Sequence, residues 1–156
     1  MKLWQKDKTS SKAVERFTVG NDREMDMYLA SFDVLGSLAH IQMLSSIGLL
    51  EQKELADLTA ELKHVYRRID SGNFVLEDGV EDIHSQVELE LTKKLGDTGK
   101  KINSGRSRND QVLVDIRLFL RHEIGEIVAE ARNLFDLLIA QSEKYKDHLL
   151  PGYTHL

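Results

Sequence analysis

Residues 109–147 read NDQVLVDIRLFLRHEIGEIVAEARNLFDLLIAQSEKYKD, a stretch without proline in which Gly125 is the single glycine. An α-helix rises about 1.5 Å per residue, so this stretch predicts a helix of about 60 Å, which is longer than a small domain is wide. Two rows of mostly apolar residues recur at intervals of seven. The first is formed by Leu113, Leu120, Ile127 and Leu134, and the second by Ile124, Ala131, Leu138 and Tyr145. Arg117, seven positions before Ile124, is the one polar residue that breaks the second row. Such a seam is typical of coiled-coil-like packing.

A further apolar stripe widens this face beyond what a two-stranded coil would cover, and it is formed by Ile116, Phe119, Val128, Phe135 and Ile139. A long helix with so broad an apolar face normally lies inside a multi-helix bundle. We therefore expect the other helices of the bundle to come from sequence beyond these 156 residues, from other subunits, or from both.

Three shorter helices are predicted before this one, because apolar residues recur there at intervals of three and four. They run from about Asp22 or Glu24 to Ile47, from Glu51 to Ile69, and from Glu81 to Leu95. Gly48 and Gly96 follow the first and the third, at the position where a glycine commonly ends a helix.

The expected fold class is therefore all-α. Residues 97–107 are polar and contain glycine, which predicts a loop. We expect residues 1–105 to form a small N-terminal helical domain. Residues 106–156 are expected to form the first long helix, and the loop after it, of a central helical-bundle domain.

Composition excludes several classes of function. Acidic residues outnumber Lys and Arg by 26 to 21, and the net charge of -5 argues against broad nucleic-acid binding, which needs a basic face. There is no cysteine, so disulfide and thiolate chemistry are excluded. The polar segment Met1–Arg16 lacks the apolar core of a signal peptide, and no run of about 18 apolar residues predicts a membrane span. We expect a cytoplasmic protein without a membrane partner.

The segment Ser104–Gln111, SGRSRNDQ, places two arginines, a serine and an asparagine directly before the long helix. An arginine fork matches a carboxylate, and the first turn of a helix adds free N–H groups and a positive dipole end. Candidate ligands for a dicarboxylate are Arg106, Ser107, Arg108 and Asn109. Residues two apart need not face the same way, so one of the two arginines is expected to point into the pocket. The alternative is a solvated loop in which Ser107 or Asn109 only caps the helix.

Two histidines are candidates for chemistry. Histidine is the usual general acid or base near neutral pH, so His155 is the candidate catalytic residue, with Thr154 as a candidate hydrogen-bond donor to a substrate carboxylate. The alternative for His155 is a surface or capping role. His84 either faces the site or interacts with Glu81 and Glu88 on a polar helix face.

The other histidines lie within helical patterns and are interpreted as structural or solvated, namely His40, His64, His122 and His148. No His-x-x-x-His pair and no carboxylate–histidine group has the sequence spacing of metal ligands. The sequence therefore predicts no metal site.

Four segments together resemble the argininosuccinate lyase family of the aspartase–fumarase superfamily. They are residues 33–40 (DVLGSLAH), 81–84 (EDIH), 104–111 (SGRSRNDQ) and 151–156 (PGYTHL), in the family's order and at about its spacing. The stretch 105–111 is close to diagnostic. The resemblance covers the whole chain, which looks like the N-terminal third of the family.

This resemblance implies a carbon–nitrogen lyase of arginine biosynthesis, which cleaves argininosuccinate reversibly to arginine and fumarate by β-elimination. A base removes a proton next to a carboxylate, the carbanion is held as a dianionic aci-carboxylate, and an acid protonates the leaving nitrogen. No cofactor is implied. Each site of the family is assembled from three subunits of a homotetramer.

The resemblance also implies roles for the candidate residues. Ser107, Arg108 and Asn109 match the family's carboxylate-binding loop. Thr154 and His155 match the segment that belongs to its acid–base machinery. His84 matches a segment near the same pocket.

Two departures from the family's pattern bear on activity. The family's serine shortly before the position of Asp26 has no clear counterpart, because residues 17–26 are about two residues longer than that region of the family. The Gly-Ser-Ser-x-Met-Pro-x-Lys-x-Asn loop, which carries the family's catalytic serine, is absent from the 156 residues. We therefore expect this chain, as an N-terminal fragment, to be inactive alone.

Two alternatives to this reading stay open. The first is another lyase of the superfamily, such as an adenylosuccinate- or aspartate-type enzyme, against which the loop of residues 105–111 argues. The second is a non-catalytic helical protein, either a structural homologue, as in the lens crystallins of this family, or an assembly fragment.

Overall fold

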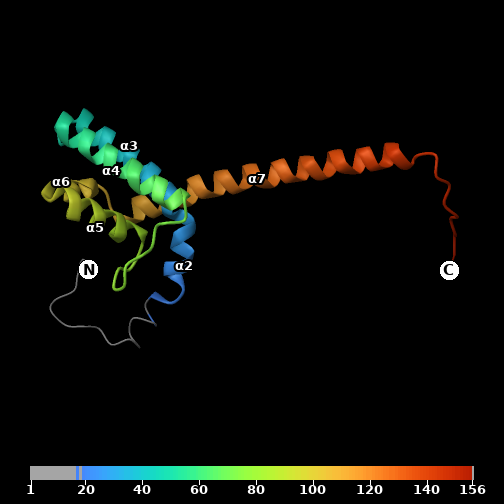
Figure 1. The fold of residues 1–156 in the computed structure, drawn as a ribbon, viewed down its shortest axis with the longest axis horizontal. Helices are drawn as coiled ribbons and strands as arrows, with labels where there is room; N and C mark the ends of the chain where they lie inside the picture. The colour runs from blue at the N-terminus through green and yellow to red at the C-terminus, as the bar shows by residue number, and fades with distance from the viewer. Residues whose placement is uncertain (1–16, 18, 156) are drawn as a thin grey trace. The chain divides into compact units, whose positions relative to one another are not determined.

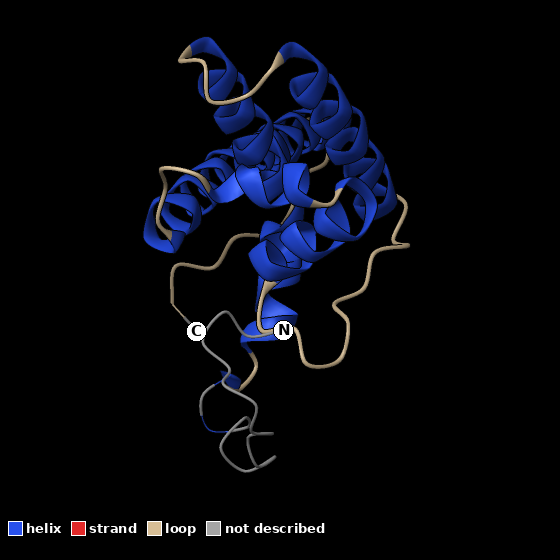
Figure 2. Ribbon diagram, turned by 90° about the vertical axis from the view of Figure 1, so that its left-hand side faces the viewer, coloured by secondary structure: helices blue, strands red, loops and turns tan. Residues whose placement is uncertain are grey.

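The computed structural model describes Phe17 and residues 19–155, which form helices and loops with no strand among them (Figures 1 and 2). The polar segment 1–16 and the last residue of the Pro151–Leu156 motif lie outside the described residues. The helical elements, in chain order, are α2 (Asp22–Asp26), η1 (Met27–Leu29), α3 (Ala30–Ser46), α4 (Gln52–Asp70), α5 (Ile83–Leu95), α6 (Asp97–Lys100), η2 (Lys101–Asn103) and α7 (Arg108–Tyr145). The all-α fold class is confirmed.

The predicted helices are all present, each with bounds close to those expected. α2, η1 and α3 follow one another without a break where one helix from residue 22 to 47 was predicted. Gly48 and Gly96 have positive φ angles of 80° and 61°, a conformation that favours glycine, and they follow α3 and α5.

The prediction that residues 97–107 form only loop is wrong, because α6 and η2 occupy residues 97–103. Gly99 makes this possible, since a Cβ atom there would lie 2.4 Å from the carbonyl carbon of Leu91 on α5. The glycine lets α6 pack directly on the backbone of α5. Asp97 and Lys100 stand at the start and the end of α6, where their charges complement the helix dipole, and they form an ion pair of 2.7 Å.

The chain divides by its packing into two units, one up to Phe119 and one from Leu120 onward. In the first unit α3 packs along α4, and α5 packs on α6. Its hydrophobic core is built from buried side chains of these elements, of η2, of the connection between α3 and α4, and of residues 73–80, namely Ala30, Val34, Ile41, Leu44, Leu50, Leu58, Leu62, Val65, Phe74, Leu76, Ile83, Val87, Leu91 and Ile102. The domain boundary near residue 105 stays a prediction.

Helix ends in the first unit are fixed by side chains. Glu51 and Glu54 form a capping box at the start of α4. The Asp82 carboxylate accepts a hydrogen bond of 2.9 Å from the Ser85 N–H and so caps α5. Because α5 begins at a fixed residue, His84 in its first turn has a fixed place.

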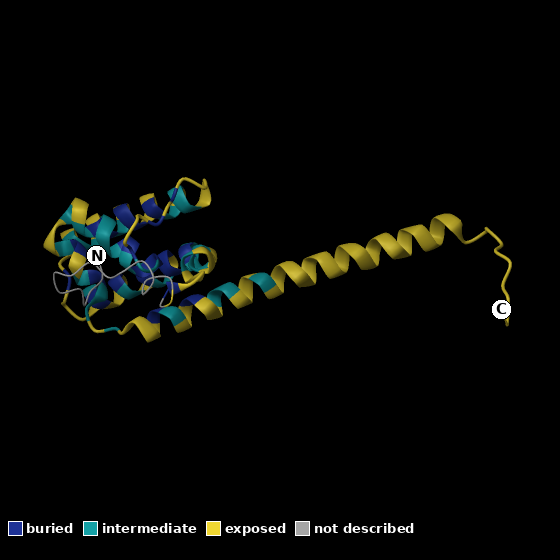
Figure 3. Cartoon of the chain, turned by 90° about the horizontal axis from the view of Figure 1, so that it is seen from below, coloured by how far each residue is buried: buried dark blue, intermediate teal, exposed yellow. Residues whose placement is uncertain are grey.

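The second unit contains the rest of α7 and the residues after it. Almost every residue from Leu120 to His155 is exposed, including apolar seam residues such as Ile127, Leu134 and Leu138 (Figure 3). The apolar face predicted from the sequence therefore exists and is uncovered within this unit. In the described part of the chain, no helix is both long enough and apolar enough to cross a membrane.

Candidate functional site

The segment 104–111 turns into α7 through a glycine and a serine cap. Gly105 has a φ of 73°, which only glycine adopts without strain. The Ser107 N–H and hydroxyl each donate to Asp110 Oδ2 at 2.8 Å, and the Asp110 N–H donates back to Ser107 Oγ at 3.3 Å. Ser107 therefore caps α7, as the alternative interpretation of this loop predicted.

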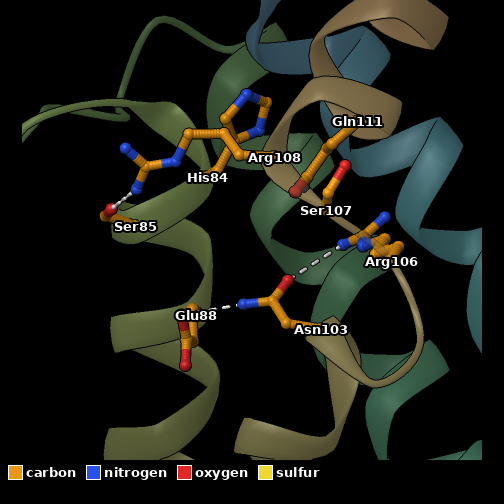
Figure 4. Close-up of a pocket in the computed structure, with 8 residues that line it drawn as sticks. All are labelled: His84, Ser85, Glu88, Asn103, Arg106, Ser107, Arg108 and Gln111. Carbon is orange, nitrogen blue, oxygen red and sulfur yellow. Dashed lines mark hydrogen bonds between the residues drawn. The ribbon is translucent and has the colours of Figure 1, made fainter. Parts of the chain in front are cut away.

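A cavity of about 70 Å³ lies where α5, the loop after η2 and the first turn of α7 meet (Figure 4). The residues that line it are His84, Ser85, Glu88, Asn103, Arg106, Ser107, Arg108 and Gln111. Four of the six candidate binding residues from the sequence therefore share one cavity.

Arg108 is the more exposed of the two arginines, and its fork is engaged. Its Nη1 pairs with Asp82 Oδ2 at 2.8 Å, and its Nη2 donates to Ser85 Oγ at 3.1 Å. The guanidinium is thus held at the cavity by groups of the α5 cap. A ligand carboxylate that binds there would compete with Asp82.

Arg106 is the more buried arginine. Its Nη2 donates to Ser37 Oγ on α3 at 3.0 Å and to Asn103 Oδ1 at 3.4 Å, and Asn103 in turn donates to Glu88 at 2.8 Å. Its buried Nε has no hydrogen-bond partner in the described part of the chain. Burial lowers the pKa of Arg106, against the opposing effect of nearby carboxylates. Both arginines line the cavity, whereas only one was expected to point into it.

His84 is buried instead of lying on a polar face with Glu81 and Glu88. Its Nδ1 lies 2.6 Å from Asp33 Oδ1 and 3.8 Å from Asp115 Oδ2. Both carboxylates are fully buried, and the histidine is 6% exposed. A buried histidine between two acids is a functional-site feature, because such groups are costly to keep in a core.

The acids shift the pKa values of this cluster. Burial alone would lower the pKa of His84, but the hydrogen bond and charge of Asp33 and the charge of Asp115 outweigh it, so the pKa is raised. Burial, reinforced by the charge of Asp33, raises the pKa of Asp115 to about 7, although His84 and Arg106 oppose the rise. Asp115 therefore has a pKa near neutral pH and lies beside a histidine whose pKa is raised.

Gly36 on α3 makes room for this cluster. A Cβ atom at this position would lie 2.9 Å from Val114 Cγ1 and 3.4 Å from Asp115 Oδ1. Any side chain here would push against the first turns of α7, and so against Asp115. The glycine in the segment DVLGSLAH thus has a packing reason.

The atoms that Asp33, His84 and Asp115 offer lie within 4.8 Å of one another, a spacing that a metal ion also requires. However, Nδ1 of His84 is already hydrogen-bonded to Asp33, and Arg106 adds a positive charge beside both acids. This balance suits protons better than a cation, and we propose no metal here.

A second cavity, of about 160 Å³, also touches His84. It is lined by Val19, Asp22, Asp26, Glu81, Asp82, His84 and Val112. Asp26 Oδ2 accepts the Ile83 N–H at 3.0 Å, and burial raises the Asp26 pKa. His84 therefore stands between an arginine-lined cavity and an acid-lined one.

The remaining candidates lie elsewhere. Asn109 is exposed on the first turn of α7 and does not line either cavity. Thr154 and His155 are exposed residues of the second unit. His40 donates from Nε2 to the Ser104 carbonyl at 2.9 Å, which confirms its structural interpretation.

Sequence reasoning missed Asp33, Asp115 and Gln111 as members of a site. The available signal was a polar residue inside an apolar helical stripe, as Asp33 is between Ala30 and Val34. The partners of Asp33 lie 51 and 78 positions away along the chain, so no local spacing reveals the cluster.

Comparison with known proteins places the chain. A family model described as lyase matches residues 4–156. Proteins named argininosuccinate lyase from Phocaeicola vulgatus and Bacteroides thetaiotaomicron are each 63% identical to it over 155 residues, which is 99% of this chain and 35% of the relative. One from Geobacter metallireducens is 42% identical over 157 residues, with 99% of this chain and 34% of the relative covered. The chain thus spans about a third of the length of these relatives, and it belongs to the lyase family.

Proposed function

We propose that the complete protein containing this chain is an argininosuccinate lyase, which cleaves argininosuccinate to arginine and fumarate by β-elimination. The observation that carries the proposal is the 63% identity, over 99% of the chain, to proteins of that name. The chemistry of the cavity supports it, because two arginines and a helix start surround one small space.

The reaction builds negative charge on a carboxylate after a proton leaves the neighbouring carbon. Donors and cations that are already in place where this charge develops lower the barrier most. Arg108 is the proposed carboxylate ligand, because its fork is held at the cavity and faces Asp82 and Ser85, which a ligand could replace. Ser107 and Asn109 at the start of α7 are proposed as further donors, and Ser107 would exchange its present acceptor, Asp110, for the substrate.

Arg106 is proposed to act mainly by its charge. It is the more buried arginine, and its Nη2 already donates to Ser37 and Asn103, so its side chain has less freedom to turn toward a substrate. A buried guanidinium beside the cavity still attracts a dicarboxylate, since charges interact more strongly away from water.

Thr154 and His155 are proposed to supply the substrate hydrogen bond and the acid–base function. We propose that they act in a homotetramer, in which each site combines residues from three subunits. The protein needs no cofactor in this scheme, and it works in the cytoplasm.

A direct assay tests the proposal. The complete protein is incubated with argininosuccinate, and the appearance of fumarate is followed by its ultraviolet absorbance. We expect turnover of about 1–1000 per second, the usual range for enzymes. Adenylosuccinate and aspartate serve as competing substrates. Cleavage of either of these, without cleavage of argininosuccinate, would reassign the protein within its family, and a folded protein that releases no fumarate would be a structural homologue.

A further inference from the structure

The imidazole of His84 lies close to two carboxylates that come from different helices. Asp33 on α3 is 2.6 Å from Nδ1, and Asp115 on α7 is 3.8 Å from it. No described group forms a hydrogen bond to Nε2, the other ring nitrogen. The ring is therefore oriented from its Nδ1 side, while the same side chain lines both cavities.

Three of the four oxygens of these two carboxylates have no hydrogen-bond partner among the described residues. Gln111 donates to Asp33 Oδ1 at 2.5 Å, the same oxygen that faces His84. Asp33 Oδ2 and both oxygens of Asp115 are buried without a hydrogen-bond partner among the described residues. Burying such oxygens is costly, so packing alone does not explain why an acid stands at each position.

The charges around His84 give a better reason than packing for acids at positions 33 and 115. Asp33 faces it from α3, Asp115 from α7, Asp82 from the cap of α5, and Asp26 from the end of α2. Arg106 is the cation that the two buried acids share. Asp82 is already paired with Arg108, so the two buried acids share one arginine, which leaves a place for one more positive charge that the imidazole of His84 fills.

We propose that Asp33 and Asp115 are positioning residues for the proposed lyase reaction: they hold the Nδ1–H of His84, present its Nε2 to substrate, and keep the ring positively charged. The cavity then carries a third cation beside Arg106 and Arg108, aimed at the carboxylate that gains charge during β-elimination. Asp33 fixes the ring by its hydrogen bond, and Asp115 acts through its charge. This inference rests on the proposed function.

The raised pKa of His84 agrees with this arrangement, and the pKa of about 7 for Asp115 means that the charge of Asp115 is fully present only above neutral pH. The pKa of His84 is raised above its ordinary value of 6.5. A raised pKa means that the cation persists to higher pH than that of an unperturbed histidine and is lost as the pH rises through the folded-state value. Removing either acid should lower that value, so the loss should occur at lower pH.

Kinetics of the complete protein test the inference. In Asp33→Asn, kcat/KM for argininosuccinate should fall about ten- to hundred-fold, by analogy with the loss of groups that orient metal-binding histidines. The alkaline limb of the pH profile should move about one unit to lower pH, because an anion next to the ring is gone. Asp115→Asn should move the limb in the same direction and by less. In Asp33→Glu, which keeps the negative charge, the alkaline limb should lie closer to its wild-type pH than in Asp33→Asn.

Glu61→Gln is the matched control. Glu61 is a buried acid of the same unit, paired with Lys94 at 2.6 Å and outside both cavities, so this variant should leave the limb where it is. If Asp33→Asn lowers the rate but leaves the pH profile unmoved, the acids are structural and the inference is wrong. A wild-type protein that releases no fumarate defeats the proposed function instead, and the two failures are therefore separate.

A measurement on wild-type protein covers variants that do not fold. The imidazole nitrogens of His84 are followed by NMR during a pH titration of the 156-residue chain. We expect a pKa above 6.5 and a proton that stays on Nδ1 at all pH values. A pKa below 6.5, or a neutral form with its proton on Nε2, would overturn the inference without any assay of activity.

Discussion

The two units of the chain depart from the usual burial pattern in opposite ways: the first buries charged side chains, and the second exposes large apolar ones. The first unit buries Asp33 and Asp115 completely, although charged residues almost never occupy a core without a reason. The second unit exposes residues such as Leu134, Phe135 and Leu138, each more than half accessible. The difference teaches where each kind of function lies, because buried charge marks chemistry and exposed apolar surface marks contact with a partner.

The largest effect we predict tests whether the second unit also carries chemistry. In the complete protein, His155→Asn should lower the rate of elimination by about 100- to 10,000-fold, the contribution of a positioned acid or base. Asparagine keeps hydrogen bonding and rough size but cannot transfer a proton. Steady-state kinetics from about pH 6 to 9 should also show that one limb of the profile is lost. A maximum that is retained with a raised Michaelis constant would make His155 a binding residue.

The next effect concerns the arginine of the first unit. Arg108→Lys keeps the charge but loses the planar fork, and it should weaken the transition state by about 1.5–3 kcal/mol. This corresponds to a fall in catalytic efficiency of roughly 10- to 150-fold. Arg106→Lys is the comparison and should cost less, since the more buried Arg106 is proposed to act mainly by its charge, which lysine keeps. Equal and small losses at both positions would mean that the loop only caps α7.

Alanine substitutions at two glycines test the difference in packing between the tightly packed first unit and the open second unit. Gly99→Ala should destabilise the first unit by about 1–3 kcal/mol, because its Cβ atom would lie 2.4 Å from the backbone of Leu91. Gly125→Ala in the second unit meets nothing within 4 Å and should stabilise α7 by about 1 kcal/mol. Urea unfolding followed by circular dichroism measures both changes. A neutral Gly99→Ala would mean that α6 does not pack closely on α5.

The smallest effect concerns the exposed face of the second unit. The 156-residue chain should self-associate at micromolar concentration in sedimentation experiments, because this apolar face is uncovered within its own unit. Leu134→Glu should weaken association by about 1–2 kcal/mol, the scale of one leucine returned to water. Glu130→Gln, on the same exposed stretch of α7, is the control and should change little. A monodisperse wild-type monomer would show that the face needs no partner.

Most of the fold was predictable because it depends on local patterns. Apolar periodicity and the glycines at residues 48 and 96 predicted four long helices within a few residues of their observed ends. α6 and η2 were missed, because residues 97–103 contain a single large apolar residue, Ile102, and so show no periodicity, and they fold against α5 through Gly99. Their helical form is a consequence of tertiary packing.

The candidate site was predictable only where its residues are adjacent in the chain. Arg106, Ser107 and Arg108 are consecutive in the chain, so their chemistry is visible in the sequence. His84 was visible as a residue but not as a buried one, since its burial depends on Asp33 and Asp115 from other helices. Which arginine is free to bind also depends on the tertiary contacts with Asp82 and Ser37.

The most direct test of the central claim is a crystal structure of the complete protein, as the His155→Asn variant, with argininosuccinate bound. The claim is that the first unit binds the carboxylate that gains charge, at the start of α7. We predict that a substrate carboxylate lies within hydrogen-bond distance of Arg108 and takes the place of Asp82 at its fork. Nε2 of His84 should point into the same cavity. Substrate bound elsewhere, with the 2.8 Å pair of Arg108 and Asp82 intact, would contradict the account.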